Sequence, residues 1–311
     1  MKKIIITIMT LSIVALLSGC GAKFDDKQTI NVYTRDTESG TREAFFSGIG
    51  FGDAAEDDSL LVSSKTVVSG NSDMVNKVLA DEYGIGYISL SSLSGSGLVG
   101  LNYEGVEATE ANVLNNTYGL KRPFNYISRE SGDYASTEVE SIVLAIIAYM
   151  NTQEGKAIII ENGGIVNVSA SDSRWSDIAS EYSVCANDNS AVNVNVGGST
   201  SVEKIAKAIT ADFKGKCGNF NPLHNHAGSS AAFKGTQNPE YKDAAATYMD
   251  LGFASRSFKD TETGVEGTYG QICWDAVVAV INESNTVIDN VTAEELKNIF
   301  NGTHTTWIEA E

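Results

Sequence analysis

The sequence predicts an α/β fold organised as two domains. Its 311 residues are enough for two domains that each bury a core. Short strands and helices alternate along the chain, which favours an α/β architecture. A strand, a polar turn rich in Gly, Ser and Thr, and a helix also follow one another twice, with a weaker third instance.

Hydrophobic periodicity and flanking glycines locate the elements. In the first part of the chain they predict a strand at 30–33, a polar turn at 35–42 that opens into a helix at Glu43, a helix at 72–83, a buried strand at 84–89, one long helical region at 138–160 and a polar connection at 175–190. In the second part they predict a strand at 191–196, a turn at 197–201, a helix at 202–213, a turn at 227–230 before a helix from Ala231, buried strands at 251–256 and 272–281, and a helix at 292–300. Thr292 and Glu295 form a capping-box pattern at the start of that last helix.

The charge balance limits the possible partners. With 40 Asp and Glu against 22 Lys and Arg, the formal net charge is −18. Phosphate backbones need clustered basic residues, so no nucleic-acid partner is expected. Hydrophobic residues at 42% and charged residues at 20% are ordinary globular values, which argues against a disordered tail protein and against a polytopic membrane protein.

The first twenty residues have the pattern of an export signal. Two lysines precede an apolar run at 4–17, about 14 residues, which is too short to span a ~30 Å hydrocarbon core. The run ends in Leu-Ser-Gly-Cys at 17–20, which resembles the lipobox of bacterial lipoproteins. This implies a signal peptide at 1–19, a lipid such as palmitate on Cys20, and a short tether at 20–28 on the outer face of the cell membrane. Loss of the signal peptide would bring the net charge to −20. An ordinary secretory signal with a chance cysteine is the alternative.

Three further cysteines follow. Cys185 and Cys217 lie in polar stretches that contain Asn and Gly, and an exported protein can keep a disulfide, so these two could be bridged or free. Cys273 lies in the apolar run at 272–281 and is predicted to be a small buried core residue.

The three polar turns indicate an oxyanion site. A helix N-terminus offers unpaired N–H groups and a partial positive charge, and small residues let an anion approach them. Arg35 adds a full charge with two-pronged geometry. Each turn alone can be an ordinary helix cap, and none is a P-loop, because no Gly-Lys-Ser or Gly-Lys-Thr follows. The prediction therefore depends on the number of turns together with Arg35.

Six segments, at 35–41, 84–89, 198–201, 228–230, 254–256 and 296–307, together resemble the phosphate-binding lipoproteins of the high-affinity phosphate ABC importer, the PstS-like proteins. The most specific feature is an Arg followed four residues later by Ser-Gly-Thr. The resemblance implies the two-lobed periplasmic-binding-protein-like α/β fold, with the ligand in a cleft between the lobes. It also implies inorganic phosphate as ligand, a membrane permease of an ABC importer as partner, and a monomer without cofactor or metal.

The resemblance also assigns ligand residues. In the family, the Arg and the Ser-Gly-Thr segment bind phosphate from one lobe, while a Thr of a Gly-x-Thr turn and a Ser of a Gly-Ser-Ser turn bind it from the other. The ligand residues implied here are Arg35, Ser39, Gly40, Thr41, Thr200, Ser201, Ser229, Ser230 and Arg256.

Two positions depart from the family pattern. In the best-known members a carboxylate follows the Ala-Ser pair and accepts the proton of hydrogen phosphate, which rejects sulfate; here Arg256 stands at that position. The acceptor is then expected to be a hydroxyl, with Ser201 and Ser230 as candidates, a backbone carbonyl or another acid, and sulfate is expected to compete better. Glu38 stands where a glycine is common, so it has to face solvent or pair with Arg42 or Arg256.

The order of the segments differs from the family's usual order, in which the Gly-x-Thr turn precedes the Arg and Ser-Gly-Thr segment. This indicates a circular permutation. It predicts one continuous lobe at 121–268 and one discontinuous lobe at 29–120 plus 269–311, with chain ends near Thr29 and Trp307 that lie close together.

Other functions have less support. His224 and His226, with Cys217 nearby, are metal-ligand residue types, but no second pair completes a zinc site. No order of Ser, His and Asp suggests a nucleophile, so no enzyme is expected. A receptor for another oxyanion, of the sulfate or molybdate class, is the first alternative, and a surface protein that keeps the fold without transport is the second.

Overall fold

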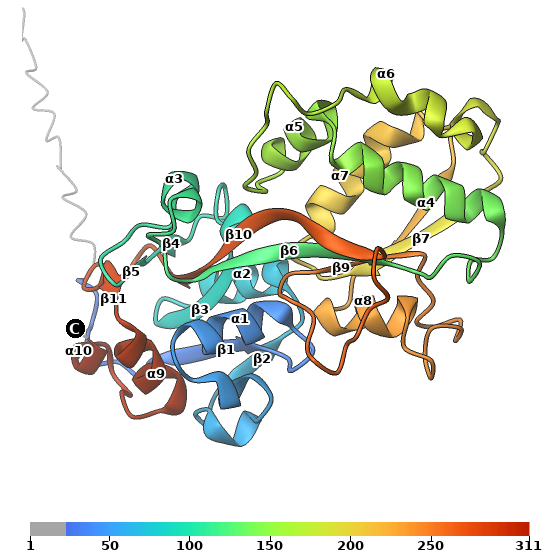
Figure 1. Cartoon of the computed structure of the whole chain (residues 1–311). Coiled ribbons are helices and arrows are strands. Elements are labelled where there is room, and N and C mark those ends of the chain that lie inside the picture. The colour runs from blue at the N-terminus through green and yellow to red at the C-terminus, as the bar shows by residue number, and fades with distance from the viewer. Residues whose placement is uncertain (1–22, 311) are drawn as a thin grey trace, which may run out of the picture.

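The computed structural model describes residues 23–310 (Figure 1). The expected signal peptide at 1–19 and the expected lipid anchor, Cys20, lie outside the described residues. Within 23–310, no helix has both the length and the apolar character needed to cross a membrane.

A mixed sheet runs through the described part of the chain. Its nine strands follow the order β2-β1-β3-β10-β6-β9-β7-β8, with β4 paired to β10. A two-stranded sheet joins β5 and β11. The strands are β1 (Asn31–Arg35), β2 (Thr66–Val68), β3 (Gly84–Ser89), β4 (Val99–Gly100), β5 (Asn102–Tyr103), β6 (Lys121–Ser128), β7 (Asn193–Gly198), β8 (Asn221–Asn225), β9 (Leu251–Ala254), β10 (Tyr269–Ile281) and β11 (Asn290–Val291).

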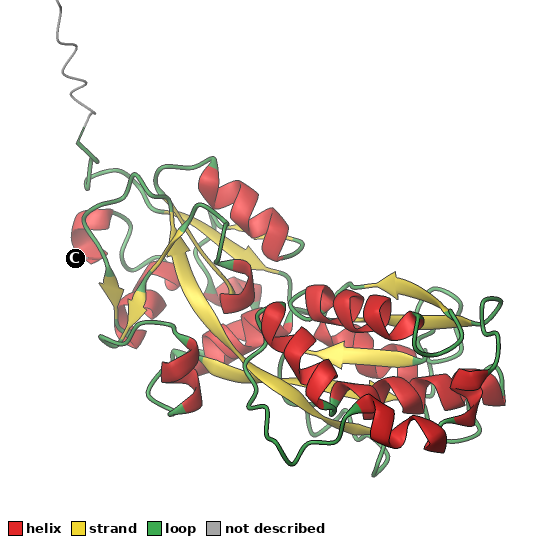
Figure 2. Ribbon diagram, turned by 90° about the horizontal axis from the view of Figure 1, so that it is seen from above, coloured by secondary structure: helices red, strands yellow, loops and turns green. Residues whose placement is uncertain are grey.

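Two parallel groups of strands flank an antiparallel centre. β1 pairs in parallel with β2 and β3, and β7 pairs in parallel with β8 and β9. Between these groups, β10 is antiparallel to β3 and β6, and β6 is antiparallel to β9. β6 and β10 therefore extend from one half of the molecule into the other (Figures 1 and 2).

Helices pack against both groups of strands (Figure 2). They are α1 (Gly40–Gly48), α2 (Asn71–Leu79), α3 (Glu110–Leu114), α4 (Thr137–Met150), α5 (Gln153–Glu161), α6 (Trp175–Ile178), α7 (Glu203–Lys214), α8 (Ser229–Thr236), α9 (Ala293–Asn301) and α10 (Trp307–Ala310). Short 3-10 helices are η1 (Gly52–Ala55), η2 (Asp58–Leu60), η3 (Leu90–Ser92), η4 (Ala179–Glu181) and η5 (Ser183–Ala186).

Two large hydrophobic cores give the molecule two lobes. The first lobe (β1–β5, α1–α3, β11, α9 and α10) packs Phe45 of α1 against Tyr87 of β3 and Phe300 of α9, with ring centroids 4.2 and 5.0 Å away. The second lobe (α4–α8 and β7–β9) packs Tyr149 of α4 against Phe213 of α7, with ring centroids 4.7 Å apart. The predicted two-lobed α/β fold is thus confirmed.

β10 contributes to both cores. Ile272 and Cys273 belong to the second core, whereas Val277 and Ile281 belong to the first. Phe24 is buried in the first core, so this lobe begins inside the segment expected to be a tether. The lobe limits at 29–120 plus 269–311 and at 121–268 therefore stay a prediction.

The helical region expected at 138–160 is two helices rather than one. α4 ends at Met150, and Thr152 caps α5 by accepting a hydrogen bond from the Gly155 N–H at 3.1 Å. The same hydroxyl donates to the Tyr149 carbonyl at 2.7 Å, so one threonine both ends a helix and starts the next. The capping box of Thr292 and Glu295 at the start of α9 is confirmed.

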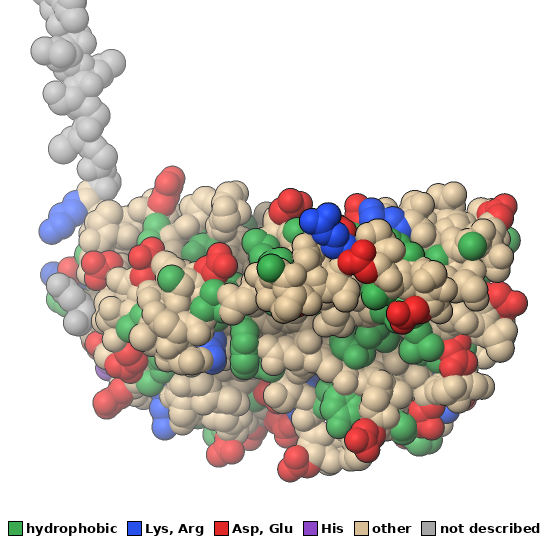
Figure 3. All heavy atoms as spheres, turned by 45° about the horizontal axis from the view of Figure 1, so that its top comes forward, with side chains coloured by type: hydrophobic (Ala, Val, Ile, Leu, Met, Phe, Trp, Pro, Cys, Tyr) green, Lys and Arg blue, Asp and Glu red, His purple; other side chains and the backbone are tan. Residues whose placement is uncertain are grey.

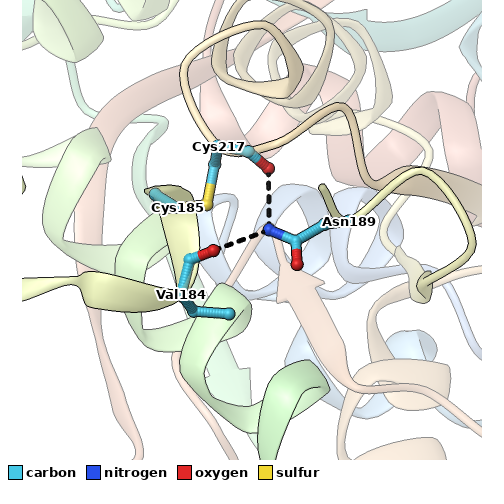
Figure 4. The surroundings of a disulfide bond; sticks show 4 residues. All are labelled: Val184, Cys185, Asn189 and Cys217. Carbon is cyan, nitrogen blue, oxygen red and sulfur yellow. Dashed lines mark hydrogen bonds between the residues drawn. A yellow bond between two sulfur atoms is a disulfide. The ribbon is translucent and has the colours of Figure 1, made fainter. Parts of the chain in front are cut away.

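The open question about the cysteines is settled. Cys185 of η5 and Cys217, which follows α7, form a disulfide (Figure 4). The side-chain amide of Asn189 holds the two ends of this link, because it donates to the Val184 and Cys217 carbonyls at 2.9 and 3.2 Å. Cys273 is free and buried as predicted, and burial raises the pKa of its thiol.

The two ends of the described chain lie side by side. Thr29 and Thr306 form an isolated β-bridge, and the Ile308 N–H donates to the Asp26 carbonyl at 2.8 Å.

Acidic side chains are spread over the face shown in Figure 3, with few basic ones among them.

Candidate anion site between the lobes

In the first lobe the site is built on the turn between β1 and α1. Arg35 ends β1, and Ser39 caps α1 by accepting a hydrogen bond from the Arg42 N–H at 3.3 Å. The Arg42 side chain fixes this turn, because its Nη1 donates to the Arg35 carbonyl at 2.8 Å. The first N–H groups of α1 are thereby held next to the Arg35 side chain.

In the second lobe the site is built on the turns after β7 and β8. β7 ends at Gly198, where φ is +101° and a Cβ would lie 2.2 Å from the Phe253 carbonyl oxygen, so a glycine is required. Ser201 lies in the turn that follows, and Ser229 is the first residue of α8. Both serines are buried, and the two turns follow neighbouring parallel strands.

The two lobes touch each other at these turns. Thr41 Oγ1 lies 2.9 Å from Ser201 Oγ, and the Asn71 amide donates to the same Oγ at 3.1 Å. A Cβ at Gly40 would lie 2.2 Å from Ser229 Oγ. The structure therefore brings Gly40 and Thr41 of the first lobe together with Ser201 and Ser229 of the second.

Arg35 has donors that no protein group uses. Its side chain is 1% exposed, and Nη2 donates to the Ser69 carbonyl at 3.1 Å. Nε and Nη1 are buried without a hydrogen-bond partner, and the nearest carboxylate, of Asp36, is 3.8 Å from Nη2. Burial lowers the pKa of Arg35. Unsatisfied charged donors are costly to bury, so this geometry favours a ligand that accepts hydrogen bonds.

The remaining predicted residues of the second lobe differ in burial. Ser229 Oγ accepts a hydrogen bond from the Ser255 N–H at 2.9 Å, and both serines are fully buried. Thr200 is half-buried and lines a cleft of about 970 Å³ between α2 and α7. Ser230 is also half-buried, and its Oγ accepts from Arg256 Nη2 at 3.3 Å.

A buried pair of opposite charges that sequence reasoning missed completes the site. Arg122 of β6 binds Asp275 Oδ2 of β10 through Nε at 2.9 Å and Nη2 at 2.8 Å. Its outer edge reaches the site, because Nη2 also donates to Ser201 Oγ at 3.1 Å and Nη1 donates to Ser255 Oγ at 3.3 Å. Asp275 Oδ2 accepts a third group, the Ser89 hydroxyl, at 2.8 Å.

The second oxygen of this carboxylate is free. Asp275 is 0% exposed and its Oδ1 has no hydrogen-bond partner. Burial raises the pKa of Asp275 and lowers that of Arg122, and each charge opposes the effect on its partner. One signal could have found the pair: Asp275 interrupts the apolar run at 272–281 that was predicted to be a core strand.

Arg256 lies at the rim of the site. Its guanidinium is 4% exposed and binds Glu262 through two hydrogen bonds of 2.6 and 2.9 Å, while Nε lies 2.8 Å from Glu43 Oε2. Glu38 is 53% exposed and pairs with Lys234 at 3.0 Å rather than with either expected arginine. Partial burial acts to raise the pKa of Glu38, but the hydrogen bond from Lys234 holds it below its ordinary value.

The residues considered for zinc are engaged elsewhere. Cys217 is in the disulfide, and His224 Nδ1 lies 3.2 Å from His226 Nε2. The outer nitrogens contact Thr210 Oγ1 at 3.0 Å and the Ser199 carbonyl at 3.1 Å. Among the residues that the structure describes, no group of three or more His, Cys, Asp or Glu side chains is placed to hold a metal ion.

The fold and the site define the class: this chain has the two-lobed fold of periplasmic binding proteins, and residues 183–310 match the family PBP_like_2, a PBP superfamily domain. Among proteins of known name, the chain is 28% identical over 304 residues to phosphate-binding protein PstS 2 of Streptococcus agalactiae serotype V, with 94% of this chain and 92% of the relative covered. It is 27% identical over 310 residues to phosphate-binding protein PstS 2 of Streptococcus pneumoniae serotype 4, with 96% and 97% covered.

A solved structure has a similar fold. The phosphate-binding protein of a phosphate ABC transporter from Streptococcus pneumoniae TIGR4 superposes with a TM-score of 0.63 at 24% identity, covering 91% of this chain and 100% of that one. The two sequence alignments extend over nearly all of each chain. These relatives therefore have their segments in the same order as this protein.

Proposed function

We propose that the protein is an extracytoplasmic receptor that binds inorganic phosphate between its lobes and delivers it to an ABC import permease. The observation that carries the proposal is the pair of unpartnered Arg35 donors, Nε and Nη1, buried where the turns of both lobes meet. The names of the relatives support phosphate as the ligand.

The proposed ligand contacts come from both lobes. From the first lobe, Arg35 supplies charge, and the N-terminus of α1 supplies the Ser39, Gly40 and Thr41 groups. From the second lobe they are Thr200, Ser201 and Ser229. To these we add Arg122 and Ser255, because the Arg122 guanidinium reaches Ser201 and Ser255 from the strand that crosses between the lobes.

The proton acceptor that the sequence left open is, in this proposal, Asp275. Its Oδ1 is a buried acceptor without a donor, and its Oδ2 is linked to Thr41 by three successive hydrogen bonds, from Arg122 to Asp275, from Arg122 to Ser201 and between Ser201 and Thr41. A ligand that carries a proton, such as hydrogen phosphate, could satisfy it, whereas fully ionised sulfate could not. The protein is then expected to prefer phosphate over sulfate although Arg256 replaces the usual carboxylate.

The attachment to the membrane remains part of the proposal. A lipid on Cys20 would hold the monomeric receptor close to its permease, because the buried Phe24 follows only four positions later in the sequence. A receptor for sulfate or molybdate is the second candidate, which Arg256 at the acceptor position favours.

Calorimetric titration of the purified, extensively dialysed protein tests the proposal. Phosphate is expected to bind at a single site, with sulfate and molybdate much weaker. Binding of sulfate or molybdate in preference to phosphate would support the second candidate. No heat with any of the three anions would leave the surface protein without transport as the better account.

A further inference from the structure

Besides the anion site, ion pairs connect the two lobes. Glu38 pairs with Lys234 at 3.0 Å, and Glu56 pairs with Lys259 at 2.6 Å. Glu43 lies 2.8 Å from Arg256 Nε and 3.6 Å from Lys259 Nζ. In each pair the acid belongs to the first lobe and the base to the second. We call these three acids and three bases the interlobe latch.

The latch lies directly beside the proposed ligand contacts. Glu38 immediately precedes Ser39, and Glu43 is in the first turn of α1. On the other side, Lys234 is on α8, which begins at Ser229. A backbone carbonyl also takes part in the contact between the lobes, because the Ser230 N–H and hydroxyl both lie 3.5 Å from the Glu38 carbonyl oxygen. Opening the lobes would therefore separate the latch and the anion contacts together.

The pairs differ in how much they can contribute. Glu56 is 73% exposed and the Glu38–Lys234 pair is about half exposed, so each is worth no more than a few-fold in an equilibrium constant. The Glu43–Arg256 pair is more buried, at 29% and 4% exposure. The ion pair of Arg256 with Glu262 lies within the second lobe and does not depend on closure. The contact of Arg256 with Glu43 joins the two lobes and therefore exists only when they are closed.

The arrangement also deals with an electrostatic problem. The chain has a net charge of −18, and two of the latch acids, Glu38 and Glu43, stand within a helical turn of the proposed anion contacts. Unpaired, they would repel an anion. Each faces a base of the other lobe only in the closed arrangement, so closure removes that repulsion and gains the ion pairs at once.

We infer that the interlobe latch sets how long the closed state lasts, so that residues which do not touch the ligand determine its rate of release. Arg256 is then a positioning residue of the closed state. The inference rests on the proposed function only in using phosphate as a reporter, because closure itself can be measured without ligand.

Rapid-mixing release of phosphate from the intact protein gives the first test. Lys234→Gln and Lys259→Gln are expected to speed release by about two- to fivefold and to change the association rate by less than about twofold. Lys216→Gln is the matched control, because Lys216 pairs with Asp212 of α7 within the same lobe. Release at the wild-type rate in both latch variants would overturn the inference.

A charge swap separates a latch from a simple effect of net charge. Glu38→Lys and Lys234→Glu should each speed release, and the double variant should return it to within about twofold of wild type, because the pair is restored with opposite polarity. If release in these three variants instead followed their net charge, the acids and bases would act only on the anion, and the latch would be wrong.

X-ray scattering of the ligand-free protein provides a measurement that does not depend on phosphate. The latch predicts a larger radius of gyration in 1 M salt than in 0.05 M salt. The reason is that the screening length falls from about 14 Å at 0.05 M to about 3 Å at 1 M, which weakens the ion pairs. The latch also predicts a larger radius in Lys259→Gln at low salt. Failure of phosphate to bind would reject the proposed function and leave this test standing, whereas dimensions unaffected by salt and by Lys259→Gln would reject the latch.

Discussion

Gly40 lies where the two lobes approach each other most closely within the site. It is the first residue of α1, and a Cβ there would lie 2.2 Å from Ser229 Oγ, 2.8 Å from Ser229 Cβ and 2.9 Å from Ser255 Oγ. The Ser229 Cβ is fixed to the backbone of α8, so the overlap cannot be relieved by turning a side chain. A side chain at position 40 would therefore hold the lobes apart without disturbing either core.

For this reason Gly40→Ala should weaken phosphate binding by at least about tenfold, since opening the site by even an ångström breaks contacts from one lobe. Calorimetry gives the affinity, and the unfolding temperature should change little. Gly215→Ala is the control, because nothing lies within 4 Å of a Cβ at Gly215. Equal affinities in the two variants would show that closure at Gly40 does not matter for binding.

Asp275→Asn should reduce the preference for phosphate over sulfate by at least about tenfold. Asn keeps the shape of the side chain but exchanges an ionised acceptor for a neutral amide, so the proton of hydrogen phosphate no longer has a special partner. Titration of each protein with both anions measures the ratio. Ser89→Ala serves for comparison, because it removes a bond to Oδ2 and leaves Oδ1 in place. An unchanged ratio in Asp275→Asn would rule out this acceptor.

Local patterns predicted the site residues that lie in helix-start turns, and they missed those on crossing strands. Ser39 and Thr41 were visible because a helix cap and its hydroxyls are close together in the sequence. Arg122 and Asp275 are 153 positions apart and meet only because β6 and β10 pair. The carboxylate partners of Arg256 likewise come from separate segments, Glu43 of α1 and Glu262 of the loop after β9, and no local pattern shows them.

At the scale of elements, the predicted strands and helices were those with strong internal periodicity or a cap. β3 spans the predicted 84–89, and β7 and α7 begin within two residues of their predicted starts. β6 was missed because Lys121, Arg122 and Pro123 look unlike a strand; it becomes one by pairing with β9 and β10. The break between α4 and α5 was missed because a single Thr152 hydroxyl makes it.

The contact between β8 and α7 makes stability depend on pH. Burial is the main cause that lowers the pKa of His224 from 6.5 to about 4, and the neighbouring His226 adds to this effect. Between these values the unfolded chain binds a proton that the folded protein does not, so acidification favours unfolding. Stability should fall as the pH drops from about 6.5 towards 4. His224→Asn should reduce this part of the slope in thermal melts at several pH values, whereas parallel slopes would show that His224 does not contribute.

At the scale of the whole molecule, two lobes are joined by the long strands β6 and β10, and the two ends of the described part of the chain meet in the first lobe. The two-lobed fold and the alternation of strands and helices were predicted from the sequence. The exact limits of the lobes were not accessible, because β10 packs into both cores along its thirteen residues. The segment order is shared with the streptococcal relatives, and its origin by circular permutation stays a prediction.

The most direct test of the central claim, that an anion binds between the lobes through Arg35, is the phosphate affinity of Arg35→Ala beside that of the wild-type protein. The account predicts that the variant loses roughly 2–5 kcal/mol of binding free energy, at least about thirtyfold in affinity, because a buried charged contact disappears. The fold should survive, since Arg35 belongs to neither hydrophobic core. Wild-type affinity in a folded Arg35→Ala protein would contradict the site and with it the proposed function.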